Sequence, residues 1–370
     1  MRRALVISLL AAVCLALGQC GRPSTPSGGE GASGTTLGQN LLVQLSGDLS
    51  YKRPGWKDYS PLTFGIALVR GDLLEVGDGA SGVLVCADLS LAPLSPGYLG
   101  GVPCPDKNQV LTRGDSLVLA PQRGANAADS IPLLLQPRHT FVRDATPLIR
   151  WAPSSPQGSL YSVRVWGGDL DWQGQTAATE LRYPADAPAL VPRTTYRVTV
   201  TDDAGRDSDA EATALDLGFV LLSPEEAAAV DKLAKQAADL RLDEEAASLV
   251  ESEILSAHNL RADAISILTR LADTGGAPAV FQRLGGLYLE VGLYAEAKHS
   301  FQAALSGFQD LGMQAWQAAA LVGLGQAQRG DGDVASARQS LEQAAQLYGD
   351  LGDQEGLGRA EQLLQDLGND

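Results

Sequence analysis

The chain is poor in positive charge, in histidine and in aromatic residues. Its 370 residues include 28 Lys and Arg against 44 Asp and Glu, and only 3 His, so the formal net charge is −16 at pH 7. A nucleic-acid-binding protein needs the opposite sign of charge to neutralise phosphates, and the sequence also lacks basic stripes and base-stacking motifs. We therefore expect no nucleic-acid partner.

The motifs of common catalytic sites are also missing. The sequence contains no zincin motif, no Gly-x-Ser-x-Gly nucleophile elbow and no Walker loop. One group of acids could gather around a calcium ion, at Asp202, Asp203, Asp207, Asp209 and Glu211. Their spacing matches no EF-hand loop, however, and a turn between strands also explains them. We predict a protein that is not an enzyme and holds neither a cofactor nor a metal.

Long hydrophobic runs are absent except at the N-terminus. Arg2 and Arg3 precede an apolar run of 14 residues, 4–17, which is too short to span a membrane and is typical of a secretory signal. The sequence Leu17-Gly18-Gln19-Cys20 then resembles the lipobox of bacterial lipoproteins, with Gln19 in place of the usual small residue. The resemblance implies a signal peptide over 1–19 and a lipid on Cys20. The alternative is an ordinary cleaved signal with an incidental cysteine.

The segment 20–40 is rich in Gly, Ser, Thr and Pro and has no apolar cluster. Such composition is typical of a flexible tether. With a lipid at its start, the tether would hold the folded part off a membrane surface. The expected location is the cell envelope, on the outer face or in the periplasm, with membrane contact through the lipid.

Few cysteines remain for other roles. Cys14 leaves with the signal and Cys20 would carry the lipid, so Cys86 and Cys104 form an even pair. In an oxidising compartment we expect these two to form a disulfide. A zinc site is the rival interpretation, but two cysteines without nearby histidines supply too few ligands.

Short strands broken by glycine turns are predicted over 41–45, 49–52, 65–69, 82–85 and 116–119. Three stretches resemble the FecR-like domain. The first is Gly-Asp-Leu-Ser-Tyr-Lys-Arg from Gly47, and the second begins at Gly65 and ends in Gly-Asp72-Leu-Leu. The third begins at Gly79, where Gly-Ala-Ser-Gly precedes a strand. The resemblance implies a small β-rich envelope module over 41–135. In its turn, Asp72 is expected to accept backbone N–H bonds.

A second β region is predicted over 138–220. Segments 147–151, 161–166 and 195–200 alternate apolar and polar residues as strands with one buried face. Trp151 in an early strand and Tyr196 at the start of a late one resemble a fibronectin type III or immunoglobulin-like β-sandwich. We expect both to be core residues. For Trp166 and Trp172, stacking on a carbohydrate is an alternative to packing.

The last part of the chain, 223–370, contains a repeated pattern. Phe281-x-x-Leu284-Gly285-x-x-Tyr288 is followed by small and aromatic residues at positions 297, 301 and 304, and the pattern recurs from Leu321 forty residues later. This spacing is typical of tetratricopeptide repeats, in which pairs of antiparallel helices stack. We predict two full repeats, a degenerate repeat before them and a C-terminal capping helix. Helices are expected at 243–257, 262–272, 277–291, 295–308, 314–328, 334–348 and 354–367, after one that starts with Ser223 as N-cap.

The predicted function follows from these modules. The repeat register points six residues into a groove as candidate partner contacts: Gln282, Leu289, Glu290, Val322, Gln326 and Arg329. The fold class is multidomain, with a FecR-like β module, a β-sandwich and helical repeats. We expect a scaffold or adaptor that binds envelope proteins through its repeats, with self-association through the repeats as a further possibility. The alternative is a sensory or ligand-binding protein whose β modules bind a glycan or a cell-wall component.

Overall fold

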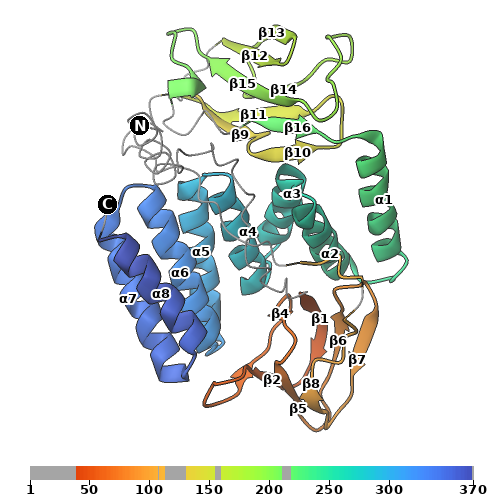
Figure 1. Ribbon diagram of the computed structural model, residues 1–370, viewed down its shortest axis with the longest axis vertical. Helices are drawn as coiled ribbons and strands as arrows, with labels where there is room; N and C mark the ends of the chain where they lie inside the picture. Colours follow the sequence, from red (N-terminus) through yellow and green to blue (C-terminus); the bar gives the residue numbers. More distant parts are fainter. Residues whose placement is uncertain (1–38, 107, 113–130, 155–159, 211–217, 369–370) are drawn as a thin grey trace, which may run out of the picture. The chain divides into compact units, whose positions relative to one another are not determined.

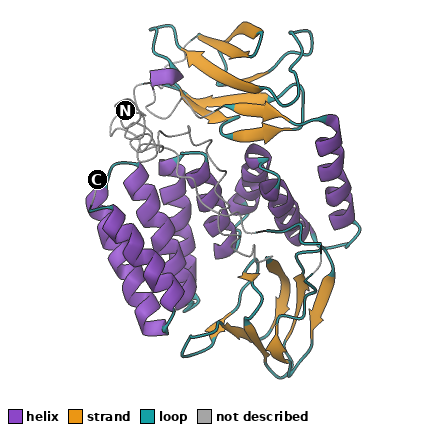
Figure 2. Ribbon diagram, viewed as in Figure 1, coloured by secondary structure: helices purple, strands orange, loops and turns teal. Residues whose placement is uncertain are grey.

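The computed structural model describes residues 39–106, 108–112, 131–154, 160–210 and 218–368. Residues Leu37–Asp370 form one compact unit. Strands occupy the N-terminal part of this unit and helices its C-terminal part (Figure 2). The last strand ends at Leu221 and the first helix begins at Pro224, so the predicted change from β to α structure near Leu222 is confirmed.

The described part of the first β region contains eight short strands. They are β1 (Asn40–Ser46), β2 (Leu49–Lys52), β3 (Ser60–Pro61), β4 (Ala67–Leu68), β5 (Leu73–Val76), β6 (Ser81–Val85), β7 (Leu91–Leu94) and β8 (Leu99–Gly101). One four-stranded sheet has the order β4-β1-β6-β7 and the other has the order β3-β2-β5-β8. The strands pair antiparallel, which suits short connections.

Alternation along the strands decides which face is buried. In β5, Leu74 and Val76 are buried while Leu73 and Glu75 are exposed, as expected for a strand with one face on a core. The strands predicted over 41–45, 49–52 and 82–85 are present. The one predicted over 65–69 is reduced to the two residues of β4, because the backbone at Gly65 turns to a φ of +79°. The segment 116–119 lies outside the described residues.

Asp72 holds the turn that leads into β5. Its Oδ2 accepts a hydrogen bond of 2.9 Å from the backbone N–H of Val69, which confirms the predicted role of this residue. The side chain is fully buried, and its Oδ1 lies 3.4 Å from Nε of Arg53. Burial raises the pKa of Asp72, while the nearby Arg53 guanidinium and the Val69 bond oppose that rise.

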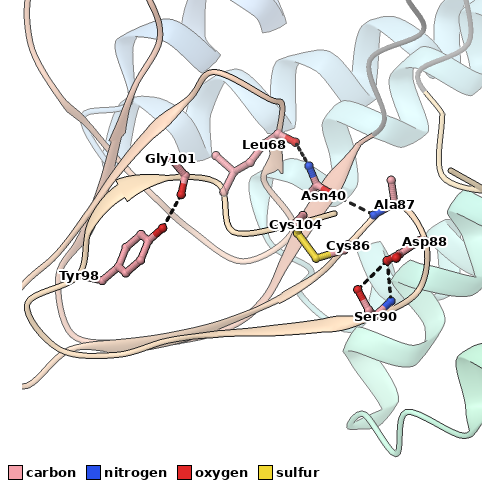
Figure 3. Close-up of a disulfide and its surroundings, with 9 residues drawn as sticks. All are labelled: Asn40, Leu68, Cys86, Ala87, Asp88, Ser90, Tyr98, Gly101 and Cys104. Atoms are coloured by element: carbon pink, nitrogen blue, oxygen red, sulfur yellow. Dashed lines mark hydrogen bonds between the residues drawn. A yellow bond between two sulfur atoms is a disulfide. The ribbon is translucent and has the colours of Figure 1, made fainter. Parts of the chain in front are cut away.

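A disulfide joins Cys86 and Cys104, whose Sγ atoms are 1.96 Å apart (Figure 3). The predicted pairing of these two cysteines is therefore confirmed. Next to it, the Asn40 side chain donates to the carbonyl oxygen of Leu68 at 3.1 Å and accepts from the N–H of Ala87 at 3.0 Å. This amide thus ties the start of β1 to segments on both sides of it.

Eight strands also occur among the described residues of the second β region. They are β9 (Leu133–Gln136), β10 (Thr140–Val142), β11 (Leu148–Ala152), β12 (Tyr161–Gly167), β13 (Leu170–Thr176), β14 (Glu180–Arg182), β15 (Thr195–Thr201) and β16 (Phe219–Leu221). A three-stranded sheet, β14-β11-β9, faces a five-stranded sheet, β10-β16-β15-β12-β13. Buried residues of both sheets form one core, so the region is a β-sandwich.

The two aromatic residues predicted to be in this core are there. Trp151 and Tyr196 are each 1% exposed. The Trp151 ring meets Tyr161 edge to face, with ring centroids 5.2 Å apart. The Tyr196 hydroxyl accepts a hydrogen bond of 2.8 Å from the backbone N–H of Val191, which fixes the corner before β15.

The helical region consists of eight helices, each packed against the next along the chain from α1 to α8 (Figure 1). Their bounds lie within about three residues of the predicted ones. The helices are α1 (Pro224–Ala238), α2 (Glu244–Ala257), α3 (Arg261–Asp273), α4 (Pro278–Glu290), α5 (Tyr294–Asp310), α6 (Gln314–Gly330), α7 (Val334–Leu351) and α8 (Gln354–Asp366).

Capping residues set several of these bounds. At the start of α1, Ser223 accepts from the N–H of Glu226, whose carboxylate in turn accepts from the N–H of Ser223, a complete capping box. Asp333 begins α7 by accepting from the N–H of Ser336 at 3.1 Å. The predicted N-cap, Ser223, is confirmed.

Candidate protein-binding surface

Glycines allow the two helices of each repeat to approach. A Cβ atom built on Gly285 of α4 would lie 3.0 Å from ring carbons of Phe301 on α5. A Cβ on Gly325 of α6 would lie 2.8 Å from Cγ of Leu341 on α7. Contacts this short leave no room for a side chain, so glycine is needed at both positions for the helices to pack this closely.

The two repeats also pack on each other. Phe301 lies in a buried cluster with Leu289 of α4 and Leu324 of α6. A Cβ atom on Gly323 would overlap the same Phe301 ring, so α6 must approach α5 as closely as α4 does. One aromatic side chain therefore sets the spacing of three consecutive helices.

The six predicted groove residues fall into two groups. Leu289 and Val322 are 0% and 6% exposed and belong to buried clusters, so their side chains contact this chain and offer no surface to a partner. The other four are partly exposed: Gln282, Glu290, Gln326 and Arg329. Their role in partner binding stays a prediction.

Two of these four residues lie on α4, and their polar groups differ in how they are satisfied. Glu290 accepts from Nε of Arg261 at 2.6 Å, which links the end of α4 to the start of α3. Oε1 of Gln282 is buried and has no hydrogen-bond partner among the described residues. The groove therefore offers few strongly charged free groups along α4.

Arg138 binds the sandwich to the repeats. The residue is 1% exposed, and its guanidinium donates to the carbonyl oxygens of Val291, Gly292 (3.3 Å) and Leu134 (3.3 Å). Val291 and Gly292 form the turn at the C-terminal end of α4, where free carbonyls and the helix dipole favour a cation. A single side chain thus satisfies acceptors of both modules.

Thr140 makes a second link, at the turn between α2 and α3. Its hydroxyl accepts from the N–H of Ala262 at 3.2 Å and donates to the carbonyl oxygen of Asn259 at 3.2 Å. The N-cap position of α3 is Leu260, which cannot cap with its own side chain. The sandwich therefore supplies the missing cap of a repeat helix.

The first β region contacts the opposite ends of the helices. The backbone N–H of Lys57 donates to the carbonyl oxygen of Leu351 at 2.9 Å, and its Nζ donates to that of Asp350 at 2.7 Å. Trp56 beside it is buried in one cluster with Leu351 and Trp316. At the start of α4, a Cβ on Gly65 would lie 3.2 Å from that of Ala279, a residue with no exposed surface.

These contacts leave the sides of the helices as the surface open to a partner. The α2–α3 and α4–α5 turns bind the sandwich, while the start of α4 and the end of α7 bind the first β region. The sequence does not reveal this arrangement, since Arg138, Thr140 and Lys57 each look like an ordinary polar loop residue. Leu260 starts α3 without a side-chain cap, but α4, α5 and α6 also start without one, so this absence does not single out the contact with Thr140.

The other proposed site residues are engaged within the chain. Trp166 has two guanidinium groups near its ring, Arg164 at 5.5 Å and Arg197 at 5.3 Å from the centroid, which hinders stacking of a sugar. Asp202 accepts hydrogen bonds from the N–H groups of Ala204 and Arg206. It therefore stabilises a turn, which is the alternative to calcium binding for this acidic residue. No metal-binding group of three or more His, Cys, Asp or Glu occurs among the described residues.

Cys20 lies outside the described residues. Within the part of the chain that is described, no helix combines the length and the apolar character that crossing a membrane requires.

Comparison with known proteins bears on the helical region. A family model described as tetratricopeptide repeat matches residues 278–350, from the first residue of α4 almost to the end of α7. No curated protein matches the chain. The matched segment contains both full repeats, and repeats of this kind are generally protein-interaction modules.

Proposed function

We propose that this protein is a non-enzymatic scaffold of the bacterial cell envelope, held at a membrane by a lipid on Cys20. Its tetratricopeptide repeats would bind envelope proteins, and possible partners include a second copy of the chain. The observation that carries the proposal is the repeat geometry over residues 278–350, where Phe301 packs three helices side by side. Such a stack presents a continuous helical surface.

The proposal extends to the identity of the β regions. For residues 41–135, the Gly-Asp72 turn and the two small antiparallel sheets support a FecR-like module. For residues 138–220, the buried Trp151 and the hydrogen bond of the Tyr196 hydroxyl support a sandwich of fibronectin type III or immunoglobulin-like type. Both regions would act as supports that hold the repeats in place.

The surface proposed for partner binding includes Gln326 on α6 and Gln282 on α4, which are partly exposed. Glutamine side chains donate and accept hydrogen bonds without a fixed charge. Several helix ends are covered by the β regions, at the α2–α3 turn, the α4–α5 turn and the end of α7, so we expect a short contact along the helix sides.

Photo-crosslinking in intact cell envelopes tests this function. A photoreactive residue replaces Gln326 in one full-length variant and Gln282 in another. The matched control replaces Gln302, which is exposed on α5. We expect the two groove positions to capture the same discrete protein and Gln302 to capture none. Capture only from positions on the β regions would contradict the scaffold and favour the sensory or ligand-binding alternative.

The anchor is tested separately with a fatty-acid probe that labels lipoproteins. The wild-type chain should be labelled and found in the membrane fraction, and Cys20→Ala should lose both properties. Equal labelling of Cys20→Ala would rule out lipidation at that position.

A further inference from the structure

A cavity of about 610 Å³ lies where the three-stranded sheet of the sandwich meets the helices. Leu135 of β9 lines one side, Ile265 of α3 lines another, and Leu293 and Tyr288 come from the turn and end of α4. These four side chains belong to one apolar cluster, so the apolar part of the wall is continuous. The volume is in the range of small-molecule sites, roughly 300–1,000 Å³.

The cavity also has a polar part. The hydroxyls of Thr269 and Tyr288 lie 3.4 Å apart, and both residues line the cavity. Burial raises the pKa of Tyr288, with Glu296 adding to the rise, so its hydroxyl keeps its proton. Oε2 of Glu296, a third lining residue, is buried and has no hydrogen-bond partner among the described residues. An unsatisfied buried carboxylate oxygen is costly, and a ligand with a donor at this point would remove the cost.

Charges at the rim do not satisfy that carboxylate. Arg143 pairs with Asp231 and Asp263, each at 3.3 Å, and Arg150 pairs with Glu180 at 3.0 Å. These guanidinium groups are therefore committed to other acids. The lining also includes Arg270, which is exposed, and two further acids, Glu251 and Asp263. The unsatisfied Glu296 oxygen beside the apolar cluster is the combination that would select a cation with an apolar body.

We infer that this cavity binds a small amphipathic amine or guanidine, with the cationic group against Glu296 and the apolar part against Leu135, Ile265 and Leu293. The site is independent of the scaffold function, because none of the six predicted groove residues lines the cavity. Binding there would couple a small molecule to the contact between the sandwich and the repeats.

Isothermal titration of the full mature chain tests the site, with 4-phenylbutylamine as the probe and 4-phenylbutyrate as its anionic match. We expect saturable binding of the amine and at least about tenfold weaker binding of the carboxylate, as loss of a charge-assisted hydrogen bond implies. Glu296→Gln should weaken amine binding by a similar factor. Glu342→Gln, on an exposed position of α7, is the matched control and should bind as the wild type does.

A second variant keeps the test sharp if Glu296→Gln does not fold. Ser266 is exposed at the rim, so Ser266→Trp should block the cavity while leaving the packed core intact. Loss of amine binding in this variant supports the site. The inference is overturned by any of three results: no saturable amine binding, equal binding of amine and carboxylate, or full binding by folded Ser266→Trp.

Discussion

Replacing Arg138 with alanine should loosen the joint between the sandwich and the repeats. The guanidinium is buried and donates to carbonyl oxygens of Val291, Gly292 and Leu134. In Arg138→Ala these acceptors lose their donor inside a space that the missing side chain leaves empty. A hydrogen bond to a charged group contributes about 1.5–3 kcal/mol, and an unsatisfied buried carbonyl costs about 1–3 kcal/mol. Since water can enter part of the space, we expect a net local loss of about 3 kcal/mol.

Native-state hydrogen exchange is the suitable assay, because it reports the local opening of the joint itself, which a denaturant transition does not resolve. Two amides report on the joint: Phe141, which donates to the carbonyl of Asn259, and Leu293, which donates to that of Tyr288. A loss of about 3 kcal/mol corresponds to exchange that is about 100-fold faster. Arg138→Lys should lie between, since an ammonium keeps the charge but lacks the planar fork.

The control is Arg182→Ala, which removes an exposed arginine paired with Asp144 at 3.1 Å. An exposed pair contributes about 0–1 kcal/mol, so exchange at the two reporter amides should be close to wild type. If Arg138→Ala exchanges no faster than Arg182→Ala at both amides, the guanidinium does not hold the joint and the reasoning is refuted.

Three further predictions concern single positions. Gly285→Ala should lower the unfolding midpoint in urea by a change worth about 1–3 kcal/mol, because its Cβ would meet the Phe301 ring, whereas Gly286→Ala, with no atom within 4 Å, should raise stability by about 0.5–1 kcal/mol. Cys104→Ser should destabilise the first β region by about 3 kcal/mol, and a reductant should lower the wild type to the same level while leaving the variant unchanged. Burial raises the pKa of Asp72, so its contribution to stability is fully present below the unfolded-state pKa, about 4, and is lost as the pH rises through the folded-state pKa. Urea midpoints of Asp72→Asn should therefore fall less than those of the wild type as the pH rises above about 4, and parallel curves would contradict this assignment.

The sequence predicts well those features that depend on residues close together along the chain or on one close contact between neighbouring helices. Gly285 and Phe301, which it faces, both belong to the repeated pattern, sixteen positions apart, so the pattern implies that they lie close together. Ser223 and Asp333 cap helices through bonds to residues three positions on, and Asp72 accepts from an N–H three positions back. Such interactions need no knowledge of distant parts of the chain.

Contacts between modules are what the sequence could not supply. The repeat register places Leu289 and Val322 on the groove side of their helices, but how deep the neighbouring helices bury them depends on the stacking of whole repeats. Arg138 and Val291 are 153 positions apart, and no periodicity links them. Strands β3 and β4 have only two residues each, too few for a period of two to show.

Contacts with the β regions also explain how so short a repeat array is held. A stack of helical repeats needs about three units to be stable, and here two full repeats follow a degenerate one. Thr140 completes the cap of α3 in that degenerate repeat, Arg138 satisfies the end of α4, and Lys57 binds the end of α7. Each contact falls where a repeat helix begins or ends, which is where free backbone groups are most costly to bury. The β regions therefore do for this array what further repeats do for a long one, and cutting the chain before Ser223 would remove that support together with the modules.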